Sequence, residues 1–186
     1  MDEKRFQLIR WSKNEKLQSV RIWSQVYDDV DSVIKACKGK NIVIAIGLNP
    51  SNKTVFNEDE TNLYLRDKIY TNFKCEGYLL TNLSAKITSD SETIHNCDII
   101  EDHIKALVKL LKVFRRRKVV VFFGVAGIEK LNSTNLSSMG ELKEILLKRR
   151  ERVYYTEDAQ EKFVHPGLRK QNYKLVKIKN DTLDKK

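Results

Sequence analysis

The chain has 186 residues, 41% of them hydrophobic and 32% charged, and this length favours one domain with its own hydrophobic core. Lys and Arg outnumber Asp and Glu by 35 to 25 and give a net charge of +10 at pH 7, which favours polyanionic partners. No apolar run approaches the roughly 20 residues that a membrane-spanning helix needs, and no apolar segment follows the charged start to form a secretory signal. We therefore expect a cytoplasmic protein with one domain over residues 1–178 and a frayed polar tail over residues 179–186.

The first part of the chain begins with two alternating segments and continues with a helix and a buried strand. Apolar and polar residues alternate over residues 6–11 and 19–23, which predicts two short strands. Helical spacing of apolar residues predicts a helix over residues 27–37 that ends near Gly39. Residues 42–47 are almost continuously apolar, which is typical of a strand buried on both faces of a parallel sheet.

Helices and strands alternate through the rest of the chain. The predicted helices span residues 61–73, 98–114 and 140–150, and the predicted strands span residues 77–83, 118–124, 153–155 and 173–178. Such alternation implies right-handed β-α-β crossovers. The predicted fold is therefore a three-layer α/β/α domain whose central, mainly parallel sheet has about four strands, with a small N-terminal β extension.

The spacing of cysteine and histidine argues against a metal centre. Cys37, Cys75 and Cys97 are an odd number of widely spaced cysteines without a C-x-x-C pair, so we expect reduced thiols rather than disulfides. His95, Cys97 and His103 match no common ligand spacing. The sequence therefore predicts no metal and no cofactor.

Loops after the buried strands are the expected ligand site, because open α/β sheets bind ligands at the carboxyl ends of their strands. The peptides 47–51, 82–85 and 124–127 follow three of these strands. Both prolines of the chain lie in such loops, in Asn49-Pro50 and His165-Pro166, and each makes a rigid corner beside a side chain that can hydrogen-bond a substrate. Ordinary turn residues are the alternative interpretation of both pairs.

The basic run Arg115-Arg116-Arg117-Lys118 precedes a predicted strand and so belongs at the opposite end of the sheet from these loops. Its charges complement the dipole at the end of the preceding helix, and we interpret the run as a solvated helix end rather than a binding surface. The basic residues between positions 169 and 179 lie nearer to the loops and are the better candidates for contact with nucleic acid.

Four segments carry a family resemblance through the order in which they occur. They are Gly47-Leu48-Asn49-Pro50-Ser51, Leu79-Leu80-Thr81-Asn82-Leu83, Val120-Val121-Phe122-Phe123-Gly124 and His165-Pro166-Gly167-Leu168. They resemble the water-activating loop, the L-L-L-N strand end, the v-f-l-l-w-G strand and the H-P-S loop of the uracil-DNA glycosylase superfamily. The chain is also similar to the DUF1643 family, which shares L-N-P-S, a following D-x-T (Asp59-Glu60-Thr61), N-L-x-A (Asn82-Leu83-Ser84-Ala85) and the late H-P. The resemblance spans residues 42 to 168, most of the chain.

The resemblance implies a pocket that holds a base flipped out of nucleic acid. Asn82 would pair with N3–H and O4 of uracil, and His165 would donate a hydrogen bond to O2, where negative charge develops. Asn49 would orient a water molecule, and Phe56 or, alternatively, Tyr64 would stack on the base. Each of these residues also has an ordinary structural role open to it, as a turn residue, a strand-end cap or a core aromatic side chain.

Neighbouring loop residues would complete the base pocket and the contact with DNA. Gly47 and Leu48 would line the pocket, and Leu168 would be the wedge that replaces the flipped base. The other residues expected to contact DNA are Ser51, Gly167, Arg169 and Lys170. Gly167 stands where the H-P-S loop has serine, so its backbone amide would replace the hydroxyl.

We predict a uracil-DNA-glycosylase-like, DNA repair-like protein that binds DNA, single- or double-stranded, around a base-sized pocket. Asn49 stands where the most active superfamily members carry an aspartate, and a neutral amide supplies neither a base nor a counter-charge, so slow or absent N-glycosidic cleavage is expected. Two alternatives stay open. One is an active hydrolase that excises uracil or another modified or mismatched base, and the other is a module that binds a protein partner or a free nucleotide in the same pocket.

Overall fold

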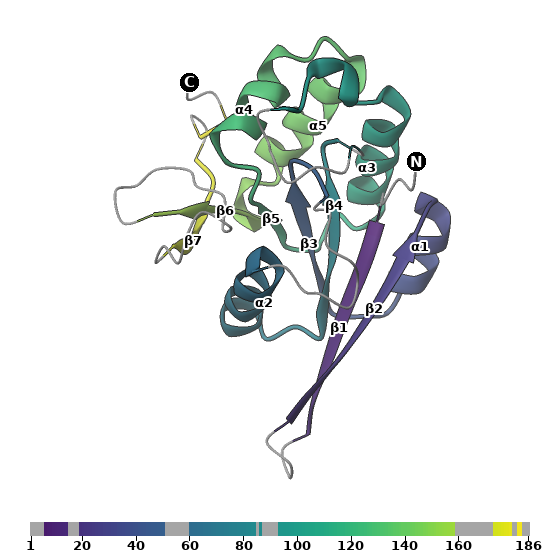
Figure 1. The fold of residues 1–186 in the computed structure, drawn as a ribbon, viewed down its shortest axis with the longest axis vertical. Coiled ribbons are helices and arrows are strands. Elements are labelled where there is room, and N and C mark those ends of the chain that lie inside the picture. Colours follow the sequence, from purple (N-terminus) through teal and green to yellow (C-terminus); the bar gives the residue numbers. More distant parts are fainter. Residues whose placement is uncertain are drawn as a thin grey trace.

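The structure is a computed structural model that describes residues 6–14, 19–50, 60–84, 86, 93–158, 173–179 and 182–183. Within these ranges the chain forms seven β-strands and five α-helices (Figure 1). The strands are β1 (Phe6–Asn14), β2 (Ser19–Tyr27), β3 (Ile42–Gly47), β4 (Gly77–Asn82), β5 (Val119–Val121), β6 (Val153–Glu157) and β7 (Lys174–Lys177). The helices are α1 (Val30–Cys37), α2 (Glu60–Phe73), α3 (Glu101–Val113), α4 (Gly124–Ser133) and α5 (Ser137–Lys148).

The seven strands form one mixed sheet in the order β2-β1-β4-β3-β5-β6-β7. The four central strands β4, β3, β5 and β6 run parallel, whereas β1, β2 and β7 run antiparallel to their neighbours. The α/β class is therefore confirmed, but the sheet is larger and more mixed than predicted. The N-terminal hairpin is part of it, because β1 pairs with β4 from Phe6↔Thr81 to Arg10↔Gly77 and so occupies an edge that parallel pairing would leave open.

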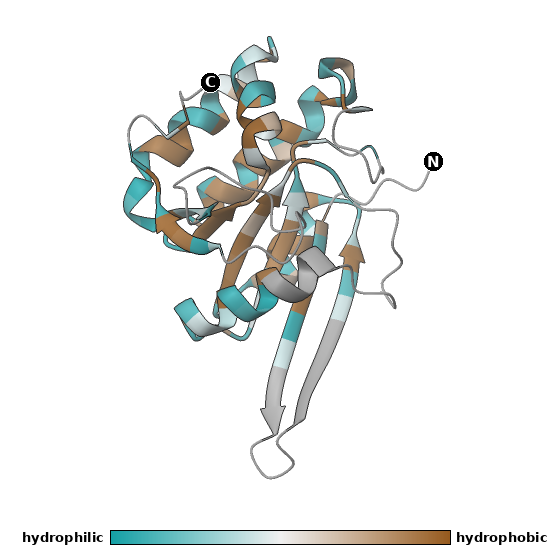
Figure 2. Ribbon diagram, turned by 60° about the vertical axis from the view of Figure 1, so that its left-hand side comes forward, coloured by the Kyte–Doolittle hydropathy of each residue, from teal (hydrophilic) through white to brown (hydrophobic). Residues whose placement is uncertain are grey.

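Alternate residues of the central strands face two separate hydrophobic clusters. Ile44 and Ile46 of β3 belong to the larger cluster and Val43 and Ala45 to the smaller one, because successive side chains of a strand point to opposite faces. Helices α1, α3, α4 and α5 contribute to the larger cluster, and α2 contributes Leu65 to the smaller one. Helices therefore cover both faces of the sheet, and the apolar strands lie between them (Figure 2).

The helix predicted over residues 27–37 begins later, at Val30, because Tyr27 belongs to β2. The Asp29 side chain accepts a hydrogen bond from the Ser32 amide at 2.8 Å and so satisfies one of the amides that the first helical turn leaves unpaired. Gly39 follows the end of α1 with a φ of 76°, which confirms the predicted glycine stop.

The starts of α4 and α5 differ from the sequence patterns. The peptide 124–127, predicted as a loop, is the first turn of α4, which Gly124 enters with a φ of 64°. Helix α5 begins earlier than predicted, at Ser137, because Glu101 of α3 accepts hydrogen bonds from the Ser137 hydroxyl at 3.1 Å and from the Ser138 amide at 3.3 Å. This carboxylate comes from a distant part of the chain and satisfies an amide in the first turn of α5. The sequence around residue 137 therefore does not indicate that the helix begins there.

Part of the predicted polar tail packs against the core. Leu183 is fully buried in the larger cluster, and Asn132 of α4 donates a hydrogen bond to its carbonyl oxygen at 2.9 Å. The Thr182 hydroxyl accepts a hydrogen bond from the Lys179 amide at 2.8 Å. The expectation of a frayed tail is therefore wrong for residues 182–183, where burial of one leucine side chain stabilises the contact.

Candidate functional site

Three chain segments meet at the carboxyl ends of the parallel strands β3, β4 and β5. The Leu83 amide donates a hydrogen bond to the Gly47 carbonyl oxygen at 2.9 Å, and on the other side of β3 the Phe122 amide donates to the Ile46 carbonyl oxygen at 2.9 Å. We call this part of the sheet the carboxyl edge; it comprises residues 47–50, 82–84 and 122–124. It is the place where ligands bind in open α/β sheets.

The side chain of Asn82 lies directly over Gly47. A Cβ atom on Gly47 would stand 2.5 Å from Oδ1 of Asn82 and 2.8 Å from Cζ of Phe122, so only glycine permits this approach. Asn82 is 6% exposed, and its side-chain amide makes no hydrogen bond to another described residue. Buried amides are nearly always hydrogen-bonded, so this amide marks a position that a ligand can satisfy.

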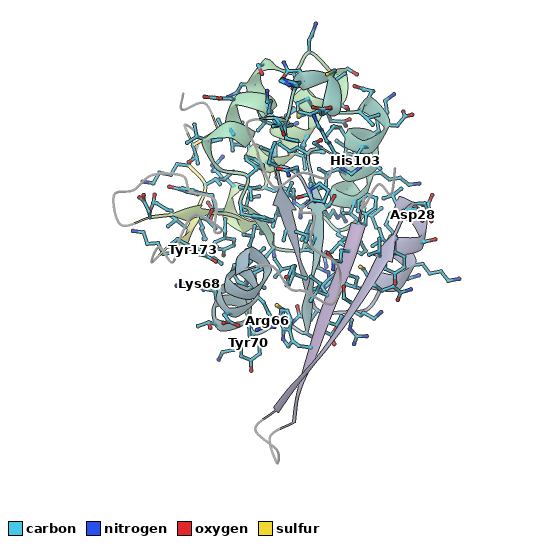
Figure 3. The ribbon with its side chains drawn as sticks, in the orientation of Figure 1. Asp28, Arg66, Lys68, Tyr70, His103 and Tyr173 are labelled. Carbon is cyan, nitrogen blue, oxygen red and sulfur yellow. The ribbon has the colours of Figure 1, made fainter. Side chains whose placement is uncertain are left out.

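His103, which lies on α3 (Figure 3), holds the backbone of Asn82. Its Nε2 lies 2.6 Å from the Asn82 carbonyl oxygen, and because a carbonyl oxygen only accepts, Nε2 is the donor. The imidazole ring is 1% exposed, and its centroid lies 5.9 Å from that of the Phe6 ring in β1. The spacing of His103 from His95 and Cys97 in the sequence fits no common metal site. In the structure, His103 instead positions Asn82 through this hydrogen bond.

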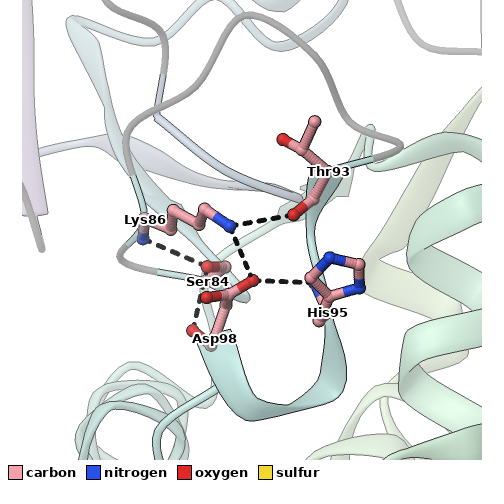
Figure 4. A network of polar contacts seen from close by, with 5 residues as sticks. All are labelled: Ser84, Lys86, Thr93, His95 and Asp98. Atoms are coloured by element: carbon pink, nitrogen blue, oxygen red, sulfur yellow. Dashed lines mark hydrogen bonds and ion pairs between the residues drawn. The ribbon is translucent and has the colours of Figure 1, made fainter.

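A polar network holds the segment that follows β4 (Figure 4). The Ser84 hydroxyl donates to the Asp98 carbonyl oxygen at 3.0 Å and accepts from the Lys86 amide at 3.1 Å. Oδ2 of Asp98 accepts from the His95 amide at 2.7 Å and from Nζ of Lys86 at 3.1 Å, and Nζ also donates to the Thr93 carbonyl oxygen at 2.9 Å. The hydrogen bond from His95 and, after it, the ammonium of Lys86 lower the pKa of Asp98 below its ordinary value.

Asn49 follows β3 at the same edge. Its side chain is half-buried, and its Nδ2 donates a hydrogen bond to the carbonyl oxygen of the buried Pro50 at 3.3 Å. The structure therefore brings Gly47, Asn49 and Asn82 to one edge of the sheet, as the sequence predicts. Leu48 differs, because its side chain packs in the larger cluster on the opposite face from Asn82, and only its backbone belongs to the carboxyl edge.

The remaining predicted site residues lie outside the described ranges. They are Ser51, Phe56, His165, Gly167, Leu168, Arg169 and Lys170. The side chain of Tyr64, the alternative to Phe56, is likewise outside the description. Their roles stay predictions, and so does the convergence of His165 with Asn49 and Asn82.

Strand β6 ends in a buried carboxylate that the motifs did not single out. Glu157 is 7% exposed; its Oε1 accepts a hydrogen bond from the Tyr155 hydroxyl, and its Oε2 lies 3.2 Å from Nζ of Lys174 in β7. The sequence signal for it is an acidic residue at the end of a mainly apolar strand. Because β7 neutralises this carboxylate, its role in the described structure is to join two strands.

No metal site or membrane span is present among the described residues. They contain no group of three or more His, Cys, Asp or Glu side chains that could hold a metal ion, and none of their helices is both long and apolar enough to cross a bilayer. The three cysteines are free, as predicted, with Cys37 and Cys75 buried and Cys97 exposed.

Comparison with known proteins identifies a family. No curated protein and no solved structure matches the chain. A family described as "Protein of unknown function (DUF1643)" matches residues 32–167, which include the four parallel strands and both Asn49 and Asn82. Since this match covers most of the sequence, the chain belongs to the DUF1643 family.

Proposed function

We propose that this protein binds nucleic acid around a base-sized site at the carboxyl edge, in the manner of a uracil-DNA glycosylase, with slow or absent cleavage of the N-glycosidic bond. One observation carries the proposal: the side-chain amide of Asn82 is 6% exposed and makes no hydrogen bond within the described residues. A carboxamide presents a donor and an acceptor side by side, so it can pair with O4 and N3–H of one uracil ring.

The surroundings of Asn82 favour binding because they limit its movement before a ligand arrives. Its backbone carbonyl is held by His103, its side chain packs against Gly47, and the chain segment that follows it is anchored through Ser84. A side chain ordered in advance loses little conformational entropy on binding. The net charge of +10 supports a polyanion as the molecule that carries the base.

A glycosylase-like fold is part of this proposal. It is supported by the parallel order β4-β3-β5-β6, by helices on both faces of the sheet and by the order of the motifs along the chain. In such a fold His165, which follows β6 in sequence, would complete the site from the neighbouring strand. DNA as the natural partner and a cytoplasmic location belong to the same proposal.

Asn49 limits the chemistry of the site. Its carboxamide can orient a water molecule, but it takes up no proton at neutral pH and offers no negative charge to an oxocarbenium-like sugar. Glu157, at the end of β6, does not replace it, since its carboxylate is engaged by Tyr155 and Lys174. Binding without rapid excision is therefore the expected behaviour.

Two single-stranded oligonucleotides that differ by one methyl group test the proposal. One carries a central uracil and the other N3-methyluracil, which lacks the N3–H donor. We expect the wild-type protein to bind the uracil oligonucleotide about tenfold more tightly, since N3-methylation removes one hydrogen bond and leaves one buried polar group of Asn82 unpaired. Asn82→Ala should remove this preference, whereas Asn135→Ala, which truncates an exposed asparagine between α4 and α5, should keep it.

Equal affinity of the wild-type protein for both oligonucleotides would overturn the proposal. Abasic sites in the same samples, measured by alkaline strand cleavage, report on catalysis separately. Slow or absent cleavage is expected, and rapid cleavage that Asn49→Ala abolishes would establish the alternative of an active glycosylase.

A further inference from the structure

A groove of about 520 Å³ lies at the amino end of the sheet, opposite the carboxyl edge. It is lined by the first residues of β3, Ile42 and Val43, by Phe73 at the end of α2, and by the turn that joins α3 to β5. It is partly open to solvent. We call it the amino-end groove.

Five cationic side chains line the amino-end groove: Arg115, Arg116, Arg117, Lys118 and Arg152. No acidic residue is among its described lining residues, and within the described chain no carboxylate lies within 4.0 Å of any of the five. Exposed lysines on α3 behave differently, since Lys105 and Lys109 each pair with a carboxylate. Clustered like charges repel one another, so this groove favours a negatively charged ligand.

The backbone of this basic turn is held by a half-buried arginine. Nη1 of Arg149 donates to the Leu111 carbonyl oxygen at 3.0 Å, and its Nη2 donates to the carbonyl oxygens of Phe114 and Arg117 at 2.9 Å each. Arg152 adds a hydrogen bond from Nη1 to the Arg116 carbonyl oxygen at 3.0 Å. The backbone of the turn is therefore ordered before any ligand binds, while Arg115 and Arg116 are exposed to solvent, as predicted for this helix end.

The aromatic rings of the groove hold cations rather than offering free faces to bases. Nζ of Lys118 lies 4.5 Å from the centroid of the Phe73 ring, and the guanidinium of Arg117 lies 5.9 Å from that of Phe114. Cation–π contacts of this kind stabilise a charged side chain on an aromatic ring. The groove thus presents positive charge beside its aromatic rings.

We propose that the amino-end groove binds the phosphodiester backbone of a nucleic acid without reading its bases. Several cations along an open groove match a chain of phosphates, because each neutralised phosphate releases counterions and strengthens binding. Inorganic polyphosphate shares this chemistry, and the test below separates it from nucleic acid. The groove lies at the opposite end of the sheet from Asn82, so this inference goes beyond the proposed function and does not depend on it.

The experiment measures how the affinity for a labelled oligothymidine depends on salt concentration. The test variant is Arg115→Gln/Arg116→Gln, whose exposed side chains make no hydrogen bond or ion pair within the described residues. The control, Lys105→Gln/Lys109→Gln, removes the same amount of charge from exposed positions on α3. We expect the slope of log K against log salt to fall in magnitude by about 1.4 in the test variant, because each phosphate on a single strand contributes about 0.7. The control should keep the wild-type slope.

Equal slopes for the wild-type protein and the groove variant would overturn the inference. A second arm adds inorganic tripolyphosphate as competitor at matched phosphate concentration. Weak competition is expected, whereas complete displacement of the oligothymidine from the wild-type protein alone would assign the groove to free polyphosphate and would also overturn it. Thymine presents the same O4 and N3–H as uracil, so the salt series is repeated in an Asn82→Ala background, where the groove variant should lower the slope by the same amount.

Discussion

Oδ1 of Asn82 lies 2.5 Å from the point at which a Cβ atom of residue 47 would stand, so Asn82 keeps its position only because residue 47 is glycine. The two residues belong to different motifs, G-L-N-P after β3 and N-L-S-A after β4, and they are register partners in the parallel pair β3–β4. One steric relationship therefore joins two motifs that lie far apart in sequence.

Replacing Gly47 should displace both of its neighbours. Gly47→Ala places a methyl group against Oδ1 of Asn82 and the ring of Phe122, and overpacking of this kind costs about 1–3 kcal/mol of unfolding free energy. Because the methyl group also displaces the Asn82 side chain, the variant should lose the preference for uracil over N3-methyluracil. Urea unfolding and the oligonucleotide titration measure the two effects.

Gly140→Ala is the matched control for that variant. A Cβ atom on Gly140 meets no other atom within 4 Å, and alanine is favoured over glycine inside a helix by about 1 kcal/mol, so this variant should be as stable as the wild type or more so. If Gly47→Ala retained both wild-type stability and the uracil preference, the steric argument would be wrong.

Arg149 should be far more important for stability than its neighbour Arg150. Its guanidinium donates three hydrogen bonds to backbone carbonyl oxygens, and the compact ammonium of a lysine cannot reproduce that planar fork. We expect Arg149→Lys to lower the unfolding free energy by about 2 kcal/mol, and Arg150→Lys, at an exposed position, to leave it unchanged within error. Equal losses in the two variants, measured by urea denaturation, would contradict this role.

Asp98 should make the stability of the segment after β4 depend on pH. Hydrogen bonds from His95 and Lys86 lower the pKa of Asp98 in the folded protein, so its contribution is present above the unfolded pKa and is lost as pH falls through the folded value. Asp98→Asn should cost about 1 kcal/mol at pH 7, and this difference should shrink below about pH 4. Unfolding of both proteins at pH 7 and pH 3 tests it.

Asp102→Asn is the control for the pH series, because Asp102 is exposed and pairs with Lys105 only at 4.0 Å. Its unfolding free energy should follow that of the wild type at both pH values. A constant difference between the wild type and Asp98→Asn across the series would show that the Asp98 charge is not what stabilises the network.

The three thiols should differ in reactivity. Burial raises the pKa of Cys37 to about 11 and also raises that of Cys75, so at pH 8 roughly one Cys37 side chain in a thousand is the reactive thiolate. Cys97 is exposed. Brief treatment of the native protein with iodoacetamide should therefore label Cys97 first, as read by peptide mass spectrometry. All three should react in urea, and equal labelling of Cys37 in the native state would contradict the described packing.

Periodicity and composition were sufficient for the parts of the fold that depend on local pattern. The continuous apolar run predicts β3, whose six residues are all buried, and helical spacing over residues 98–114 predicts α3 to within a few residues. The order of apolar and polar residues shows whether one or both faces of a segment are buried, so a strand or helix of normal length can be predicted from it. The G-L-N-P and N-L-S-A motifs follow predicted strands, and the structure places Asn49 and Asn82 at the same edge of the sheet.

Contacts between distant segments were decided by the tertiary structure alone. The sequence by itself established an α/β protein, and it did so because side-chain patterning is local. Only packing determined that β1 joins β4, that Glu101 starts α5, and that Arg149 organises a basic turn into a groove. Each of these depends on which surfaces meet in three dimensions, and no spacing along a single chain specifies that.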